Sequence, residues 1–375
     1  MIVTLQAGIG KEDARVEAVV ALAEANGLAP QVREVAGANI SVTEVYLTDG
    51  PKATAAMYPE HMFRLEGVDN VRRVTPSAVS LKAGNGAKPH HVKVGRVMFG
   101  NDLPCQLIVG PCTVDRHIDR LVGNLVSEHG VKFVRGGCWK PRSSAYAFPG
   151  FGEQAVEWLL SAAKAHGVEA VFLEVIDTSH LDAVRRIRDQ VGYAGQIVLW
   201  IGARTGNLTL LRALGMQNEF VVMLKNPIDG SIGQWVTNAE FVVAGERYFD
   251  DDVRLDIQRS LRQGNDQILF CARGVQHHDT ASLYRFAPRH DMIDAIRAGY
   301  WVPVGLDPSH SAGTMVNDLV IRNLEAGLVH LPAFVLLEVA LDNVKPLCDA
   351  AQAVPLSRLR QVQKMIFRHN EVMGG

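Results

Sequence analysis

The chain has 375 residues, with 38 Lys and Arg against 40 Asp and Glu, a formal net charge of −2 and 47% hydrophobic residues. We find neither a clustered positive surface nor an apolar run of about 20 residues, which argues against nucleic-acid partners and against a membrane-spanning helix. The first residues lack the charged-then-apolar order of a signal peptide, so we expect a cytoplasmic protein. The five cysteines are odd in number and have no CxxC spacing, which argues against a disulfide framework.

Alternating and helical patterns at the start of the chain predict a small α+β domain over residues 1–84. The expected elements are a strand, a helix, two strands, a short helix and a last strand, with the longer ones at Met1–Gln6, Glu12–Asn26, Gln31–Val35, Ile40–Leu47 and Val68–Val74. This order is typical of the ferredoxin-like β-α-β-β-α-β fold.

A Gly- and Pro-bearing segment at residues 83–89 marks the expected boundary, after which a second domain covers residues 85–375. A weakly alternating stretch at about 91–100 predicts a hairpin at the start of this domain. The polar stretch at 245–252 predicts a surface extension that carries an extra helix.

Eight short apolar runs, each followed by a helical pattern, then continue to the end of the chain. They are Gln106–Val109, Phe133–Val134, Ala170–Leu173, Ile197–Ile201, Phe220–Leu224, Ile268–Phe270, Val302–Leu306 and Ala333–Leu337. Strands buried on both faces are apolar throughout, and eight such repeats predict a (β/α)8 barrel, a fold of about 250 residues. A doubly wound open sheet is the alternative, but it needs no eighth repeat.

Cationic residues follow several of these runs, where the active site of a (β/α)8 barrel lies. They are Arg135, Arg204, Lys225 and Arg273, with Lys140 and Arg142 in the loop after the second run. Like charges repel, so their convergence is reasonable only around anions, and guanidinium groups suit phosphate and carboxylate. The pattern therefore indicates phosphorylated substrates. The alternative is that these cations pair with carboxylates such as Glu174 and Asp177.

A second set of strand-end residues offers sulfur, nitrogen and oxygen donors. It consists of Cys112, His310, Glu338 and Asp349. Mixed donors fit a borderline divalent ion, such as Mn, Fe, Co or Zn, better than Mg or Ca. Alternatively, Cys112 is a small core residue and His310 a hydrogen-bonded residue at the barrel rim.

Six short motifs appear in order along the chain and suggest a family. They are Gly110-Pro111-Cys112, Arg135-Gly136-Gly137 with Lys140-Pro141-Arg142-Ser143-Ser144, Ile201-Gly202-Ala203-Arg204, Lys225-Asn226, Cys271-Ala272-Arg273-Gly274 and Asp307-Pro308-Ser309-His310. With them the chain resembles, over essentially its full length, the class I beta synthases of 3-deoxy-D-arabino-heptulosonate 7-phosphate (DAHP). These are the first enzymes of the shikimate pathway, which leads to aromatic amino acids.

The resemblance implies a condensation of phosphoenolpyruvate with erythrose 4-phosphate at a divalent metal. It implies Cys112, His310, Glu338 and Asp349 as metal ligands, eleven residues separating the last two. Lys140, Cys112 and His310 would be catalytic, with Lys140 as the candidate acid. The implied substrate-binding residues are Arg135, Lys140, Pro141, Arg142, Ser143, Ala203, Arg204, Lys225, Arg273 and Asp307.

The resemblance extends to the small domain and to the assembly. Residues 1–84 look like the ACT-type regulatory domain of some family members, which implies feedback inhibition by an aromatic amino acid. A structural appendage is the alternative for this domain. The family also implies a homo-oligomer, with a tetramer as the expected form.

Three departures from the family pattern bear on these expectations. Ala340 replaces the usual His, Ala272 replaces the usual Glu, and the segment after Arg273 also differs. Ser143, where the family usually has Thr, is a separate and milder change that keeps the hydroxyl. None of these changes a proposed metal ligand or phosphate-binding cation, but they weaken the assignment of the acceptor aldehyde. The alternatives are a sister synthase that uses another aldose phosphate, such as arabinose 5-phosphate, and a non-catalytic metabolite sensor.

Overall fold

The computed structural model divides the chain into two compact units. Met1–Lys82 with Ala244–Gly264 make up the first, and Ala83–Val243 with Asn265–Gly375 make up the second. No helix within the described residues is long and apolar enough to cross a membrane. The structure describes residues 1–36, 41–47, 59–72, 81, 89–141, 144–245, 264–279, 281–312, 317–348 and 352–374.

The first unit contains a four-stranded antiparallel sheet with order β2-β3-β1-β4. Its described elements are β1 (Ile2–Leu5), α1 (Ala14–Ala25), β2 (Pro30–Ala36), β3 (Ser41–Leu47), α3 (Pro59–Phe63) and β4 (Val68–Arg72). This strand order and these directions are those of the ferredoxin-like fold, so the prediction is confirmed.

The first unit has its own hydrophobic core. Val3 of β1 and Val45 of β3 are fully buried, and they belong to the same apolar cluster as Val16, Val19 and Ala23 of α1. These helix positions recur at intervals of three and four residues, the spacing that places side chains on one helical face. The inward-facing side chains of the strands and the apolar face of α1 thus pack together in one layer.

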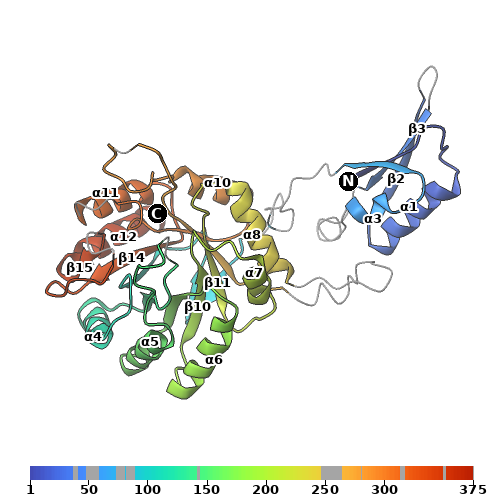
Figure 1. Cartoon of the computed structure of the whole chain (residues 1–375). Helices are drawn as coiled ribbons and strands as arrows, with labels where there is room; N and C mark the ends of the chain where they lie inside the picture. The colour runs from blue at the N-terminus through green and yellow to red at the C-terminus, as the bar shows by residue number, and fades with distance from the viewer. Residues whose placement is uncertain are drawn as a thin grey trace. The chain divides into compact units, whose positions relative to one another are not determined.

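The second unit is a closed barrel of eight parallel strands (Figure 1). The sheet runs in the order β13-β12-β11-β10-β9-β8-β7-β14, and pairing of β13 with β14 closes it. Its strands are β7 (Gln106–Gly110), β8 (Phe133–Gly136), β9 (Ala170–Glu174), β10 (Gln196–Ile201), β11 (Val221–Lys225), β12 (Ile268–Ala272), β13 (Val304–Leu306) and β14 (Phe334–Ala340). Each overlaps one of the eight predicted runs, so the barrel prediction is confirmed and the open sheet is excluded.

Helices alternate with the strands and surround the barrel (Figure 1). In α4, for example, Ile118, Leu121, Val122 and Leu125 are buried at helical spacing, and the helix ends at Gly130 in the left-handed conformation. The helices are α4 (Ile118–His129), α5 (Glu153–Ala165), α6 (Ser179–Val191), α7 (Leu208–Gly215), α8 (Ile232–Ala244), α10 (Asp291–Gly299), α11 (Asn317–Leu328) and α12 (Leu359–Gly374). Short β15 (Val354–Pro355) pairs with β14, and the 3-10 helix η2 (Leu356–Arg358) precedes α12.

A two-stranded hairpin covers the N-terminal end of the barrel. Its strands are β5 (Val92–Val94) and β6 (Val97–Phe99). The fully buried Phe99 ring lies 5.3 Å from the ring of Phe133 and 5.8 Å from that of Phe334, centroid to centroid. Because Phe133 and Phe334 begin their strands, the hairpin fills the barrel at that end with apolar side chains. The opposite end is left for polar residues.

Candidate functional site

A pocket at the C-terminal ends of the barrel strands gathers most of the described residues predicted for the site. Its lining includes predicted substrate-binding residues from the ends of β8, β10, β11 and β12 or the loops after them, together with His310. The lining residues are Arg135, Lys140, Pro141, Glu174, Trp200, Gly202, Ala203, Arg204, Lys225, Arg273, Arg285, Phe286 and His310. Arg142, Ser143 and Asp349 lie outside the described residues.

Cys112 and Lys140 are in direct contact beside the pocket. Lys140 Nζ donates to the carbonyl oxygen of Cys112 at 3.0 Å and lies 3.2 Å from its Sγ. The Sγ of Cys348 lies 3.1 Å from that of Cys112.

Gly110, at the end of β7, permits the close packing of β7 on β8. Its φ is +157°, and a Cβ there would lie 2.0 Å from the carbonyl oxygen of Arg135.

The surroundings of Cys112 and Lys140 act on their protonation. The hydrogen bond with Cys348 and burial raise the pKa of the Cys112 thiol well above its ordinary value, and the charge of Glu338 acts in the same direction. Burial acts to lower the pKa of Lys140, but the negative charges of Cys112, when ionised, and of Glu174 outweigh burial and raise this pKa above its ordinary value. Lys140 is therefore protonated at neutral pH.

Asp307 is fully buried and links two predicted site residues. One carboxylate oxygen, Oδ2, accepts from Lys225 Nζ at 2.5 Å and lies 2.7 Å from His310 Nδ1. The other accepts from the backbone N–H groups of Ser309 and His310. Burial acts to raise the pKa of Asp307, but His310, when it is protonated, and the charge of Lys225 hold it well below its ordinary value. Asp307 thus fixes the His310 ring with Nε2 available on its other side.

Glu338, on β14, is fully buried with unsatisfied carboxylate oxygens. Oε1 lies 3.3 Å from Arg135 Nη1 and 3.4 Å from His310 Nε2. Neither carboxylate oxygen has a hydrogen-bond partner in the part of the chain that the structure describes. Burying a charged group without hydrogen bonds is costly, so this geometry indicates that a further group belongs beside Glu338 and His310.

The donors at this point suit a borderline divalent metal. Cys112, His310 and Glu338 offer sulfur, nitrogen and oxygen, and the unsatisfied oxygens of Glu338 are those that a cation would engage. Burial lowers the pKa of His310, which favours the neutral imidazole that binds metals. No three His, Cys, Asp or Glu side chains within the described ranges are placed closely enough to hold a metal. The donor chemistry fits a metal, and convergence of the four ligands stays a prediction.

The charge of the pocket is strongly positive. Glu338 and Asp307 face Arg135 and Lys225, respectively. Arg273 is only 6% exposed, and its Nε and Nη2 have no hydrogen-bond partner among the described residues. Burial, opposed by Asp307, lowers the pKa of Arg273 to about 10, which leaves the guanidinium charged at neutral pH. A buried cation with unsatisfied donors indicates an anionic ligand.

The alternative that the cations pair with Glu174 and Asp177 at the barrel rim is only partly supported. Glu174 does line the pocket. Asp177 instead accepts hydrogen bonds from the backbone N–H and the hydroxyl of Ser179. Ion pairs to Arg135 and Lys225 come from Glu338 and Asp307, which are deeper in the barrel.

Three lining residues were not singled out in the sequence: Trp200, Arg285 and Phe286. The Trp200 ring lies 5.0 Å from the guanidinium carbon of Arg135 and 5.5 Å from Lys225 Nζ. It lies inside an apolar run, where it is indistinguishable from a core residue. Arg285 and Phe286 are in the irregular segment after β12, where no strand end points to the pocket.

Comparison with known protein families shows to which family a chain with these site residues and this fold belongs. The family model described as "DAHP synthetase I family" matches residues 78–373. The chain belongs to the DAHP synthetase I family. The matched residues include the entire barrel and every described residue of the site, and the protein is an enzyme of this family.

Relatives of the DAHP synthetase I family extend the similarity to the small domain. The phospho-2-dehydro-3-deoxyheptonate aldolase of Thermotoga maritima is 29% identical over 376 residues, covering 100% of this chain and 99% of the relative. A crystal structure of the DAHP synthase from the same organism has a TM-score of 0.69 and 26% identity, covering 100% of this chain and 97% of that chain. A truncated form of that synthase has a TM-score of 0.61 and 26% identity, covering 79% of this chain and 96% of that chain.

Two departures from the usual DAHP synthase pattern lie at backbone contacts of the barrel. The carbonyl oxygen of Ala272 accepts a hydrogen bond from the backbone N–H of Asp307 at 2.7 Å. Ala340 pairs with Pro355 at the start of β15. Backbone contacts do not depend on the side chain, so both positions keep a structural role with alanine.

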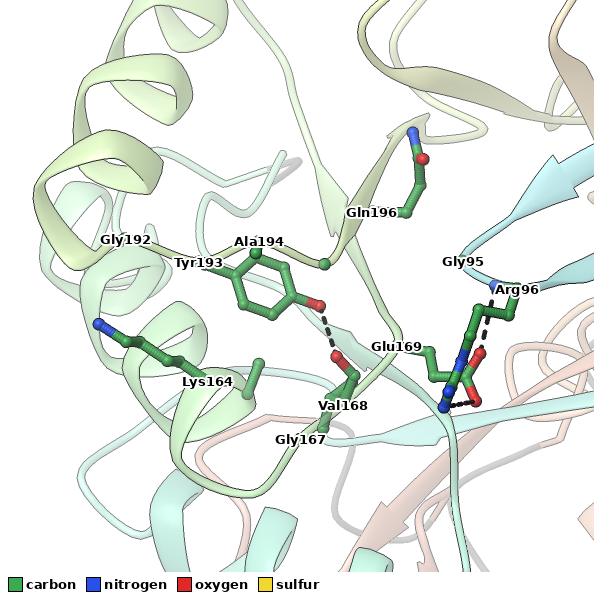
Figure 2. Close-up of a pocket in the computed structure, with 12 residues that line it drawn as sticks. Gly95, Arg96, Lys164, Gly167, Val168, Glu169, Gly192, Tyr193, Ala194 and Gln196 are labelled. Carbon is green, nitrogen blue, oxygen red and sulfur yellow. Dashed lines mark hydrogen bonds and ion pairs between the residues drawn. The ribbon is translucent and has the colours of Figure 1, made fainter.

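A second pocket in this member of the DAHP synthetase I family has different chemistry (Figure 2). It lies near the ends of α5 and α6, and its polar groups contact one another. Arg96 pairs with Glu169 at 2.9 Å, Lys164 Nζ donates to the Val191 carbonyl oxygen at 2.7 Å, and the Tyr193 hydroxyl donates to the Val168 carbonyl oxygen at 3.0 Å. These groups already have partners, so we place the functional site at the cationic pocket.

Proposed function

We propose that this enzyme condenses phosphoenolpyruvate with erythrose 4-phosphate in a metal-dependent reaction that yields DAHP and phosphate. One observation carries the proposal: six cations line a pocket that also contains His310, and His310 lies beside the fully buried Glu338. The carboxylate oxygens of Glu338 have no hydrogen-bond partner among the described residues. Two phosphorylated substrates and a Lewis acid are the ligands that such a site suits. The reaction would be the first step of the shikimate pathway.

Phosphoenolpyruvate would bind to the cations at the ends of β10, β11 and β12. Arg204, Lys225 and Arg273 would hold its phosphate and carboxylate, with Arg135 nearby. Arg135, Lys225 and Arg273 are at most 7% exposed, so their charges act in a medium where solvent screening is weak. Fixed cations also stabilise the charge that shifts to the departing phosphate.

Erythrose 4-phosphate would bind along the loop after β8. Lys140, Pro141, Arg142 and Ser143 would contact it, and Ala203 would line the same space. Lys140 is placed by its bonds to Cys112, so its proton would be available at the aldehyde oxygen. This arrangement keeps the aldehyde between the nucleophile and a proton donor.

The reaction makes one carbon–carbon bond and releases one phosphate. C3 of phosphoenolpyruvate bonds to the aldehyde carbon, Lys140 protonates the aldehyde oxygen, water adds at C2, and phosphate leaves from C2. Cys112, His310, Glu338 and Asp349 would hold a divalent ion (Mn, Fe, Co or Zn), which when bound polarises the aldehyde. Asp307 holds His310 and Lys225 in register throughout.

Phosphate release is the direct test of this function. With phosphoenolpyruvate, we expect kcat/KM to be about 100-fold higher for erythrose 4-phosphate than for arabinose 5-phosphate, because the pocket must reject an extra hydroxymethylene unit. A chelator should abolish release, and Mn, Fe, Co or Zn should restore it. A preference for arabinose 5-phosphate would instead establish the sister synthase, and no release with either aldehyde would establish the metabolite sensor.

We also propose that the ferredoxin-like unit is an ACT-type regulatory domain that binds an aromatic amino acid. Its similarity to the full-length Thermotoga maritima synthase, of which a truncated form also exists, supports this role. Deleting residues 1–84 should leave phosphate release active and reduce inhibition by Phe, Tyr or Trp by about 5- to 150-fold. Unchanged sensitivity in the truncated enzyme would reduce the domain to a structural appendage.

The proposal includes an assembly and a location. The family resemblance supports a homo-oligomer, with a tetramer as the expected form. The substrates are phosphorylated metabolites, which supports a cytoplasmic location.

A further inference from the structure

The segment that follows β12 folds back against the loop that carries His310. The backbone N–H groups of Arg285 and Phe286 donate to the Ser311 carbonyl oxygen at 3.1 and 3.4 Å, and Val275 forms a two-way bridge with Ala287. Gly274 permits this fold, since a Cβ there would lie 2.8 Å from the Cβ of Phe286. These backbone hydrogen bonds therefore hold the segment that carries Arg285 at the pocket.

Three guanidinium groups surround the ring of Phe286. Their central carbons lie 4.4 Å (Arg273), 5.2 Å (Arg285) and 5.9 Å (Arg204) from the ring centroid. All four residues line the same pocket, and Phe286 is only 9% exposed. The face of an aromatic ring attracts cations, so one buried ring offers contact to all three arginines.

This arrangement has a cost that an anion would remove. Arg273 is buried, whereas Arg204 and Arg285 are exposed at the pocket. The like charges repel, and the repulsion acts most strongly on the buried Arg273, where solvent screening is weak. Burial lowers the pKa of Arg273, and although Asp307 opposes this, the charges of Arg204 and Arg285 lower it further. The Nε and Nη2 atoms of Arg273 are buried and have no hydrogen-bond partner within the described residues. A tetrahedral dianion would satisfy these donors and reverse the repulsion.

We propose that Arg285 adds a third guanidinium to the subsite of Arg204 and Arg273, which takes the phosphate group of phosphoenolpyruvate. Phe286 is the positioning residue that orients the three arginines. The assignment rests on the proposed function. It is independent of the metal site and of the acceptor aldehyde. A neutral residue at 285 removes one donor pair from the phosphate, and a non-aromatic residue at 286 removes the shared ring.

Titration of the full chain with phosphoenolpyruvate, and separately with inorganic phosphate, tests this subsite without requiring turnover. Arg285→Gln should raise the Kd for both ligands by about tenfold or more, the range of a charged hydrogen bond. Arg285→Lys keeps the charge but not the planar fork and should recover part of the affinity. In steady-state assays, Arg285→Gln should raise the KM for phosphoenolpyruvate while the KM for erythrose 4-phosphate stays within about twofold of wild type.

Arg289→Gln is the matched control, because Arg289 is in the same segment and is also exposed, but it pairs with Asp291 and does not line the pocket. It should bind both ligands as wild type does. Phe286→Leu should weaken phosphoenolpyruvate binding by about threefold or more, and Phe286→Tyr, which keeps the ring, should restore it.

Equal Kd values for wild type and Arg285→Gln would overturn the subsite, as would a selective rise in the KM for erythrose 4-phosphate. Thermal unfolding of each variant separates lost binding from lost folding, and Arg285→Lys keeps the test open if Arg285→Gln does not fold. If wild type releases no phosphate with any aldehyde, the proposed function fails, whereas the titrations still decide whether Arg285 binds phosphate.

Discussion

Replacing Lys140 with methionine is expected to lower kcat for phosphate release by about 10³-fold. Lys140 lies at the pocket, contacts both the carbonyl oxygen and the sulfur of Cys112, and is protonated at neutral pH. Methionine has a similar length but supplies neither charge nor proton, so the loss combines general-acid and electrostatic contributions. Steady-state phosphate release with phosphoenolpyruvate and erythrose 4-phosphate measures it.

Lys132→Met is the matched control for this prediction. Lys132 is 58% exposed, and its ammonium group lies 3.9 Å from Glu169, away from the cationic pocket. Its replacement should leave kcat within about twofold of wild type, since exposed ion pairs contribute little. A Lys140→Met enzyme that keeps more than about a tenth of wild-type kcat would remove Lys140 from the role of proton donor.

Cys112→Ser is expected to weaken binding of the divalent metal by about 100-fold or more. The substitution keeps the size of the side chain but replaces the sulfur donor, which suits borderline metals, with a hydroxyl group. Metal retained after equilibrium dialysis against Mn or Zn measures the loss directly, without reference to activity. Phosphate release at limiting metal should fall in parallel.

Cys105→Ser separates loss of a ligand from general disturbance of the barrel. Cys105 is also buried, but it precedes β7 at the opposite end of the strand, and Asn370 bonds its backbone. This variant should retain its metal. Full metal occupancy in Cys112→Ser would contradict the assignment of Cys112 as a ligand and confine its role to packing against Lys140.

The positive charge of the pocket contrasts with the formal net charge of −2 of the whole chain. Six cations line one pocket, although the whole chain has more acidic than basic residues. Such segregation concentrates the positive field where phosphorylated substrates enter. The overall charge balance therefore conceals the feature that best indicates the substrate class.

Much of the fold could be predicted because its signals are local. Strands buried on both faces are apolar along their whole length, as Ala170–Glu174 is, and amphipathic helices repeat every three or four residues. Once eight such units are recognised, barrel topology places the residues after each strand at one end. This is why Arg135, Lys225 and His310 could be assigned to one site.

Distances between those residues could not be predicted. His310 and Glu338 are 28 positions apart in sequence, yet their side chains approach to 3.4 Å because β13 and β14 close the barrel. The pairing of Arg135 with Glu338 likewise depends on β14 lying next to β7. Contacts of this kind are set by the register of the closed sheet, which no local pattern encodes.

Periodicity and composition act over a few neighbouring positions, so the residues alone predict the barrel, the ferredoxin-like unit and the residue types at the strand ends. Three features become visible only in the folded chain: Asp307 holds both Lys225 and His310, Trp200 lies beside two cations, and Arg285 reaches the pocket. These contacts join segments that are far apart in the chain. Their strength depends on burial, which arises only once the barrel has closed.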